Sequence, residues 1–164
     1  MLYRLLFVSL AIILLLASGA VGKEGAKMST FSIKSTAFKD NTSIPKQYTC
    51  DGKDINPPLV IRNVPNGTRS LALIVDDPDA PVGVWVHWVL WNIDPGTTQI
   101  AENSVPAGAV QGKNDFRKTN YGGPCPPSGT HRYFFKLYAL DTKLDLSSNA
   151  KKQDLEKAMK GHIL

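Results

Sequence analysis

The chain has 164 residues, with 19 Lys or Arg and 14 Asp or Glu, so its formal charge is +5. A length of this order fits one domain. The basic residues are spread along the chain rather than clustered, apart from the pair Lys151-Lys152. This distribution is typical of a solvated surface and argues against a nucleic-acid-binding protein. It is consistent with a weak attraction to anionic lipids or anionic substrates.

The first 22 residues have the order of a secretory signal peptide. Arg4 precedes an almost wholly apolar run over residues 5–17, and small residues follow. We expect export with cleavage after Ala20 or Gly22. The alternative is an N-terminal membrane anchor through residues 5–21, because this stretch approaches the roughly 20 residues that a spanning helix needs. We therefore expect the protein to be exported, and so extracytoplasmic, or to be anchored in a membrane through this segment.

The next segments have the patterns of short strands. Phe31 and Ile33 alternate with polar residues, as in a half-buried strand. Residues 59–61 form a second predicted strand, and the continuous apolar run 70–75 predicts a strand that is buried on both faces. Residues 85–93 carry apolar side chains on both faces, which predicts a central strand between two layers.

Period-two alternation assigns the side chains of the central strand to its two faces. One face carries Trp85, His87, Val89, Trp91 and Ile93, and the other carries Val86, Trp88 and Leu90.

Loops separate these strands, and one helix is expected at the end. Residues 41–58 and 97–130 are predicted as irregular, and the Pro and Gly residues of the second stretch favour an ordered loop. Residues 133–140 form the last predicted strand. A helix is expected over 151–160, with Gly161 as its C-cap. The pattern as a whole predicts a β-sandwich-like domain with long loops at one end.

The two cysteines, Cys50 and Cys125, both lie in turn-prone surroundings. In an exported protein an even pair suggests a disulfide. The alternative is two buried thiols that do not meet, and sequence spacing does not decide between them.

Three segments carry polar side chains that can form one site. The loop after the strand 70–75 carries Asp77 and Asp79, the central strand carries His87, and the last strand is preceded by His131 and begins with Tyr133. Two imidazoles and a phenol can donate hydrogen bonds to an anionic oxygen such as that of phosphate. A carboxylate fixes which imidazole nitrogen carries the proton.

Other interpretations of the same residues stay open. A buried histidine on an apolar face is often a hydrogen-bonded core residue, and the aspartates of the loop can simply cap turns. A metal site is disfavoured because no H-x-H or H-x-x-x-H spacing occurs. A Ser-His-Asp hydrolase would need a nucleophile on a strained turn, and Ser128 near His131 lacks the G-x-S-x-G pattern.

Three motifs in order resemble the phosphatidylethanolamine-binding protein family, also called the Raf kinase inhibitor protein family. They are DPDAP at 77–81, VHWVLWNI at 86–93, and GKNDF followed by YGGPCPPSGTHRYFFKLYALD within 112–141. TCDG at 49–52 and PPL at 57–59 are similar to its bacterial and archaeal branch. The resemblance covers residues 30–164, which we therefore expect to form the family-like domain. Residues 1–22 lie outside it, and we expect them to form the signal peptide or anchor described above.

The resemblance implies a mainly β fold, with an antiparallel β-sandwich core, a few short helices and a C-terminal helix. It also implies a small pocket for anions such as phosphate or phospholipid head groups. The matching pocket positions in this sequence are Asp77, Pro81, Trp85, His87, Pro126, His131 and Tyr133. Asp79 is expected to support the loop.

The sequence departs from the family pattern at three places. Family members carry glycines where this chain has Arg117 and Asn120, and Arg tolerates left-handed backbone poorly, so we expect the loop to differ there. Relatives continue beyond Leu164, so we expect a more open pocket mouth. The expected helix begins after Lys151, whose side chain cannot cap it.

The sequence therefore predicts a non-enzymatic binding protein without catalytic residues, metal or cofactor, whose partner is a small anion or a phospholipid head group. Two alternatives remain. The protein could inhibit or regulate a partner protein, such as a serine protease, through an exposed loop, or it could be a hydrolase that uses the same pocket.

Overall fold

The computed structural model describes residues 30–164. The predicted signal peptide or membrane anchor over residues 1–22 lies outside these residues. Within residues 30–164, no helix has the length and apolar character needed to cross a membrane.

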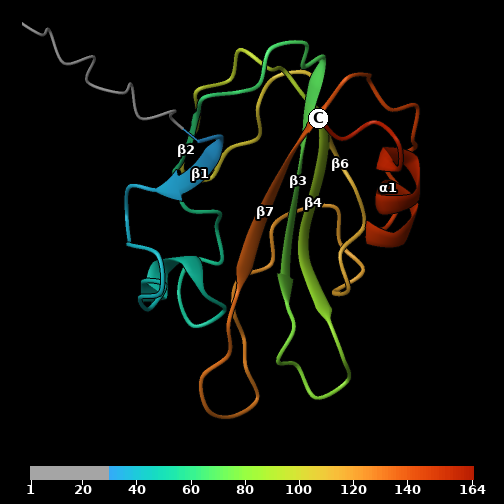
Figure 1. The fold of residues 1–164 in the computed structure, drawn as a ribbon. Helices are drawn as coiled ribbons and strands as arrows, with labels where there is room; N and C mark the ends of the chain where they lie inside the picture. The colour runs from blue at the N-terminus through green and yellow to red at the C-terminus, as the bar shows by residue number, and fades with distance from the viewer. Residues whose placement is uncertain (1–29) are drawn as a thin grey trace, which may run out of the picture.

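Two antiparallel sheets and one C-terminal helix form the domain (Figure 1). The small sheet has the order β1 (Ser32–Ser35), β2 (Leu59–Arg62) and β5 (Gln99–Ile100). The large sheet has the order β6 (Val110–Gln111), β4 (Trp85–Ile93), β3 (Ser70–Asp77) and β7 (Phe134–Leu140). The helices are α1 (Lys152–Met159) and the 3₁₀-helix η1 (Lys46–Tyr48). The mainly β fold with a β-sandwich core and a C-terminal helix is confirmed.

The large sheet is the middle layer, and each of its faces covers a separate apolar core. One core lies between the two sheets and joins Leu59 and Ile61 of β2 to Leu73 of β3 and Trp88 of β4. The other core lies under α1, where Leu155 contributes to a cluster with apolar residues of β3 and β4. Every residue of β3 is buried, as the continuous apolar run predicted.

The strict alternation predicted for β4 is wrong at both ends of the strand. The pairing of β3 with β4 shifts register twice, and each shift puts an extra residue into β4. One shift lies at Asn92, whose φ is 54°, and it turns Ile93 to the core between the sheets. The other shift lies at His87 and turns Val86 to the α1 core. A β-bulge bends a strand and re-aims its side chains, which a period-two pattern does not anticipate.

Three short elements lie in stretches that were predicted to be irregular. They are η1 within 41–58, and β5 and β6 within 97–130. Each of the two short strands pairs with a long one: Ile100 lies opposite Leu59, and Val110 opposite Trp91. Two-residue strands carry no local pattern, because their pairing is set by the neighbouring strand.

Helix α1 begins and ends close to the predicted positions. Its first free backbone donor, the Lys151 N–H, is satisfied by the Asp154 carboxylate at 2.9 Å rather than by a capping side chain at Lys151. Gly161 follows the helix with φ +84°, a conformation that favours glycine and ends the helix.

The carboxylate of Asp76 forms ion pairs that link β3 to both β7 and α1. Its side chain is fully buried and lies 2.8 Å from Lys136 Nζ and 2.6 Å from Lys152 Nζ. Burying an ionised carboxylate destabilises the folded state unless cationic groups pair with it. The two lysines offset this loss of hydration for Asp76.

We predict that Lys152→Met lowers the free energy of unfolding by about 2 kcal/mol, because it leaves the buried Asp76 with one cation. Lys151→Met, one position earlier and exposed, should change it by less than about 0.5 kcal/mol. Urea unfolding of both variants checks this, and equal effects would contradict the role of Asp76.

Candidate functional site

The predicted site residues gather where β3 ends and β4 begins, beside the segment that leads into β7 (Figure 1). Two contacts join these chain segments. His131 Nδ1 lies 2.7 Å from Asp77 Oδ2, and the Arg132 guanidinium forms a two-point contact with Asp79 at 2.6 and 2.8 Å. The Arg132 side chain and its backbone N–H hold the pKa of Asp79 well below its usual range. Arg132 is thus an exposed ion-pair residue.

Asp77 positions His131. Asp77 is only 3% exposed, and its second oxygen accepts the Asp79 backbone N–H at 2.8 Å. Because an ionised carboxylate only accepts, His131 Nδ1 must carry the proton of their hydrogen bond. The remaining ring nitrogen of His131, Nε2, is therefore the one available to a ligand.

His87 occupies the bulge in β4 and is fixed in one tautomer. Its Nδ1 lies 2.7 Å from the carbonyl oxygen of Gly122, so Nδ1 carries the proton. Burial lowers the pKa of His87, although the Gly122 carbonyl opposes this shift. Its ring lies edge-on to the rings of Tyr133 and Phe116, at centroid distances of 5.2 and 5.3 Å.

The hydroxyl of Tyr133 is buried and makes no hydrogen bond of good geometry among residues 30–164, although the Asp77 carboxylate and the Cys125 backbone lie near enough to shift its pKa. Burial, followed by the negative charge of Asp77, raises the pKa of Tyr133 to about 12. The phenol is therefore neutral near pH 7 and keeps its proton as a donor. An unpaired buried hydroxyl is uncommon in proteins and calls for an explanation, which a ligand oxygen would supply.

Phe116 completes an aromatic group around His87, although it was not among the predicted site residues. Its ring packs edge-on against Trp85 at 5.4 Å as well as against His87. A Cβ at Gly122 would lie 2.7 Å from the Phe116 ring, so this position requires glycine. The NDF triplet that contains Phe116 is part of the family motif, and this was the only signal for its role.

Two polar residues hold the loop 112–121 against β4, and both were missed as site residues. Asn114 is buried and donates to the carbonyl oxygens of His87 and Asn120 at 3.2 and 2.8 Å. Asp115 accepts the Val86 backbone N–H at 2.7 Å. These contacts fix the loop beside His87.

Arg117 lies in this loop with left-handed backbone, at φ 63°. The chain thus adopts at Arg117 the conformation that glycine favours, whereas Asn120 is not left-handed. The expectation that arginine would avoid this geometry is wrong. Asn114 holds the turn, because its backbone carbonyl accepts the Arg117 N–H at 3.0 Å and its side-chain oxygen accepts the Lys118 N–H at 2.9 Å. The left-handed conformation costs a residue other than glycine about 1–2 kcal/mol.

The Pro-rich corner before β7 is attached to the segment around η1. Cys50 and Cys125 form a disulfide with a Cα–Cα distance of 5.4 Å, so the structure selects the first of the two alternatives. Cys50 N–H also donates to the Pro124 carbonyl at 3.1 Å, and Gly123 N–H donates to Asp54 at 2.6 Å. The corner is thereby fixed at three points.

The seven predicted residues do not all face the same space. Pro126, His131 and Tyr133 line a groove of about 630 Å³. Asp77 and His87 are buried and lie outside the lining of this groove; Asp77 contacts His131, and His87 contacts Tyr133. Trp85 is half-buried against Phe116, and Pro81 is exposed in the β3–β4 loop.

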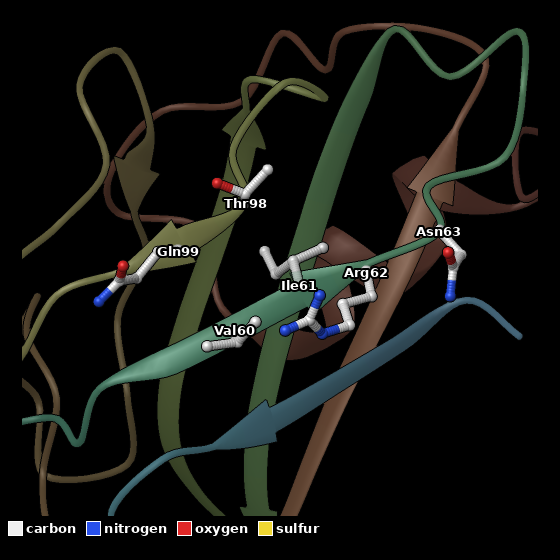
Figure 2. Close-up of a pocket in the computed structure, with 6 residues that line it drawn as sticks. All are labelled: Val60, Ile61, Arg62, Asn63, Thr98 and Gln99. Atoms are coloured by element: carbon white, nitrogen blue, oxygen red, sulfur yellow. The ribbon is translucent and has the colours of Figure 1, made fainter. Parts of the chain in front are cut away.

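A second hollow of about 460 Å³ lies on the small sheet (Figure 2). Its lining residues come from β2 and the segment that leads through β5: Val60, Ile61, Arg62, Asn63, Thr98 and Gln99. None of the predicted site residues lies here. Its lining lacks the carboxylate, imidazole and phenol groups that the sequence predicted for the site, so this hollow is not the predicted site.

The positions of the acidic, histidine and serine side chains can be compared with what the metal-site and hydrolase alternatives require. In the described part of the chain, no group of three or more His, Cys, Asp or Glu side chains is placed to hold a metal ion. Ser128 is exposed, and its hydroxyl makes no hydrogen bond to His131 in this structure.

Known proteins are similar to this chain in sequence and in fold. Residues 34–164 match the family model described as phosphatidylethanolamine-binding protein. A UPF0098 protein of Methanothermobacter thermautotrophicus is 55% identical over 138 residues, which cover 81% of this chain and 91% of the relative.

Two solved structures are similar. A phosphatidylethanolamine-binding protein homologue from Chlamydia trachomatis has a TM-score of 0.79 and 42% identity, over 82% of this chain and 90% of its own. YbcL of E. coli, described as a member of the mammalian family, has a TM-score of 0.77 and 33% identity, over 83% of this chain and 93% of its own.

We predict that His87 makes the protein less stable below about pH 6.5. Because burial lowers the pKa of His87 in the folded state, the unfolded chain binds more protons in acid, and stability falls as the pH falls. Its contribution is at most about 1.4 kcal/mol per pH unit. His87→Asn, which keeps a donor near the Gly122 carbonyl, should lose less stability than the wild type between pH 7.5 and pH 5.5. Equal losses in urea unfolding would contradict this assignment.

We also predict that Arg117→Gly raises the free energy of unfolding by about 0.5–1 kcal/mol. The substitution relieves the left-handed strain, and the greater entropy of glycine in the unfolded chain offsets part of the gain. Lys118→Gly, at the next residue and without a positive φ, should destabilise instead. Thermal unfolding of the two variants measures the difference, and a loss of stability in both would show that Arg117 is unstrained.

Proposed function

The chain belongs to the phosphatidylethanolamine-binding protein family, and on this premise we propose that it is a non-enzymatic protein that binds small anions or phospholipid head groups. The binding groups are the His131 imidazole and the Tyr133 hydroxyl, supported from behind by Asp77 and His87. The observation that carries the proposal is the Tyr133 hydroxyl, which is buried and unpaired next to the Asp77–His131 pair.

The hydrogen bonds of the two histidines decide which ring nitrogen of each is left to donate to or accept from a ligand. With Nδ1 of His131 bonded to Asp77, a proton on Nε2 makes the ring an imidazolium. Such a ring donates a charge-assisted hydrogen bond to a phosphate oxygen. His87, whose pKa is lowered by burial, holds the edge of its ring against Tyr133.

The same contacts favour binding over hydrolysis. A Ser-His-Asp mechanism needs a hydroxyl within hydrogen-bond reach of the histidine, and His131 has only its contact to Asp77 in this structure. Asp77 accepts one hydrogen bond at each oxygen, from the Asp79 backbone N–H and from the His131 ring, and so serves to orient His131. These residues can orient and bind an anion without forming or breaking covalent bonds.

We place this function outside the cytoplasm, either in an exported protein or at a membrane. The support is the signal-peptide-like order of residues 1–22 and the Cys50–Cys125 disulfide, which is typical of oxidising compartments.

We predict that Tyr133→Phe weakens the binding of inorganic phosphate and of phosphoethanolamine about tenfold, because it removes one hydrogen bond to a charged ligand. The same change should leave thermal stability unchanged or raise it, since the hydroxyl has no partner in the protein. Titration calorimetry and thermal unfolding measure the two effects.

Tyr138→Phe is the matched control in the strand β7 that follows Tyr133, because Tyr138 packs with the α1 core. It should leave the affinity for phosphate unchanged. His131→Ala should abolish most of the binding. Unaltered affinity in both Tyr133→Phe and His131→Ala would refute the proposed function.

A further inference from the structure

The turn between β2 and β3 carries a sequence that is typical of glycosylated proteins. Residues 66–68 read Asn-Gly-Thr, which fits the pattern N-x-[ST] in which x is not proline. In exported proteins an oligosaccharide is linked to the asparagine of this pattern on the protein surface. Residues 41–43, Asn-Thr-Ser, fit the same pattern. The surroundings of the two asparagines decide which of them is the better acceptor.

Asn66 lies at the corner of a tight turn. Thr68 N–H donates to the Pro65 carbonyl at 3.3 Å, and Gly67 has a φ of +86° while Asn66 has no positive φ. A positive φ at the third residue alone is the mark of a type II turn. A Cβ built on Gly67 would meet no atom within 4 Å beyond its chain neighbours. The space beside the turn is therefore open.

The side-chain amide of Asn66 is exposed and makes no hydrogen bond within residues 30–164. Asn92 and Asn114, in contrast, donate their amides to backbone carbonyls. The Thr68 hydroxyl donates to the Pro65 carbonyl at 2.6 Å, and its oxygen can still accept a hydrogen bond. The amide nitrogen of Asn66 is thus free to form a new bond at the surface.

Asn41 has different surroundings, although it is also exposed. Its backbone is left-handed, at φ 60°, and the following residue is tied back. The N–H and Oγ1 of Thr42 both donate to the Lys39 carbonyl, at 3.2 and 2.7 Å. Asn41 also lines the groove beside His131. A sugar at Asn41 would therefore lie over the proposed anion site.

The β2–β3 turn lies at the opposite end of β3 from that site (Figure 1). The turn precedes Ser70, where β3 begins, and the site lies where β3 ends at Asp77. The strand has eight residues, which at about 3.3 Å each separate the two regions by roughly 20 Å or more. A sugar at Asn66 would leave the groove open.

We propose that Asn66 is the acceptor of an N-linked oligosaccharide. The donor is an oligosaccharide carried on a polyprenyl diphosphate. The Asn66 Nδ2 forms a bond to the anomeric carbon of the first sugar, and the bond from this carbon to the diphosphate oxygen breaks. The electron pair leaves with the lipid diphosphate, and the amide nitrogen gives one proton to a basic group of the transferase. The inference rests on the proposed location outside the cytoplasm, where exported chains meet such donors.

The test uses the purified full-length protein in its folded, disulfide-bonded form. It is incubated with a single-subunit archaeal oligosaccharyltransferase and a polyprenyl-diphosphate-linked oligosaccharide, and an unrelated acceptor peptide shows that the transferase is active. We expect intact-mass spectrometry to show a mass increase of one oligosaccharide. Peptide mapping should place the sugar on Asn66.

Four variants locate the acceptor. Asn66→Gln should abolish the mass increase. Thr68→Ala keeps Asn66 but removes the hydroxyl of the pattern, so it should abolish the increase too, whereas Thr68→Ser should retain it. Asn41→Gln is the matched control at the second occurrence of the pattern and should be modified like the wild type. Thermal unfolding confirms that each variant is folded.

Two results would overturn the proposal. One is a folded protein that stays unmodified, whether or not the reduced and denatured chain is modified. The other is a sugar found on Asn41 instead of Asn66.

Phosphate titration of the modified and unmodified protein separates this inference from the proposed function. The affinity for phosphate should be the same in both forms, because the turn is remote from His131. Phosphate binding without glycosylation would overturn the acceptor site alone. Glycosylation of Asn66 in a protein that binds no phosphate would overturn the anion site alone.

Discussion

Two adjacent buried carboxylates at the end of β3 hold the domain and its site together. Because side chains alternate along a strand, Asp76 and Asp77 point to opposite faces of the large sheet. Asp76 faces α1 and is neutralised by Lys136 and Lys152. Asp77 faces the other way and holds His131 at 2.7 Å. One short segment thus holds α1 on one side of the sheet and orients His131 on the other.

The bulge at His87 is the second constraint, and it acts on the same end of the sheet. The extra residue in β4 separates His87 from Val89 and Trp91, which belong to the α1 core. The His87 ring instead contacts Phe116 and Tyr133. Bulges are frequent next to functional sites because they re-aim one side chain without disturbing the rest of the strand. The loop held by Asn114 then covers His87 and supplies the Gly122 carbonyl that fixes its tautomer.

The two layers of the site have different tasks. Behind the surface, Asp77 orients His131 and His87 packs against Tyr133, while Pro126, His131 and Tyr133 line the groove. The disulfide at Cys125 and the Arg132–Asp79 pair keep the chain between them in place. Such preorganisation suits a binding protein, because a ligand then meets groups that need little further ordering. The groove beyond Tyr133 continues to the half-buried Phe135, which packs against the core between the sheets.

The sequence alone determined the strands and the helix whose pattern of apolar and turn-forming residues lies within the element itself. The tertiary structure decided the features that depend on contacts with residues far away in the chain. Continuous apolar runs located β3 and β4, and Leu155, Met159 and Gly161 located α1, because burial and backbone preference are encoded residue by residue. Three motifs indicated the family and the candidate residues. Non-local pairing decided β5 and β6, the bulge at His87, the disulfide and the left-handed Arg117. These features arise from contacts between residues far apart in the chain, which no local pattern of side chains specifies.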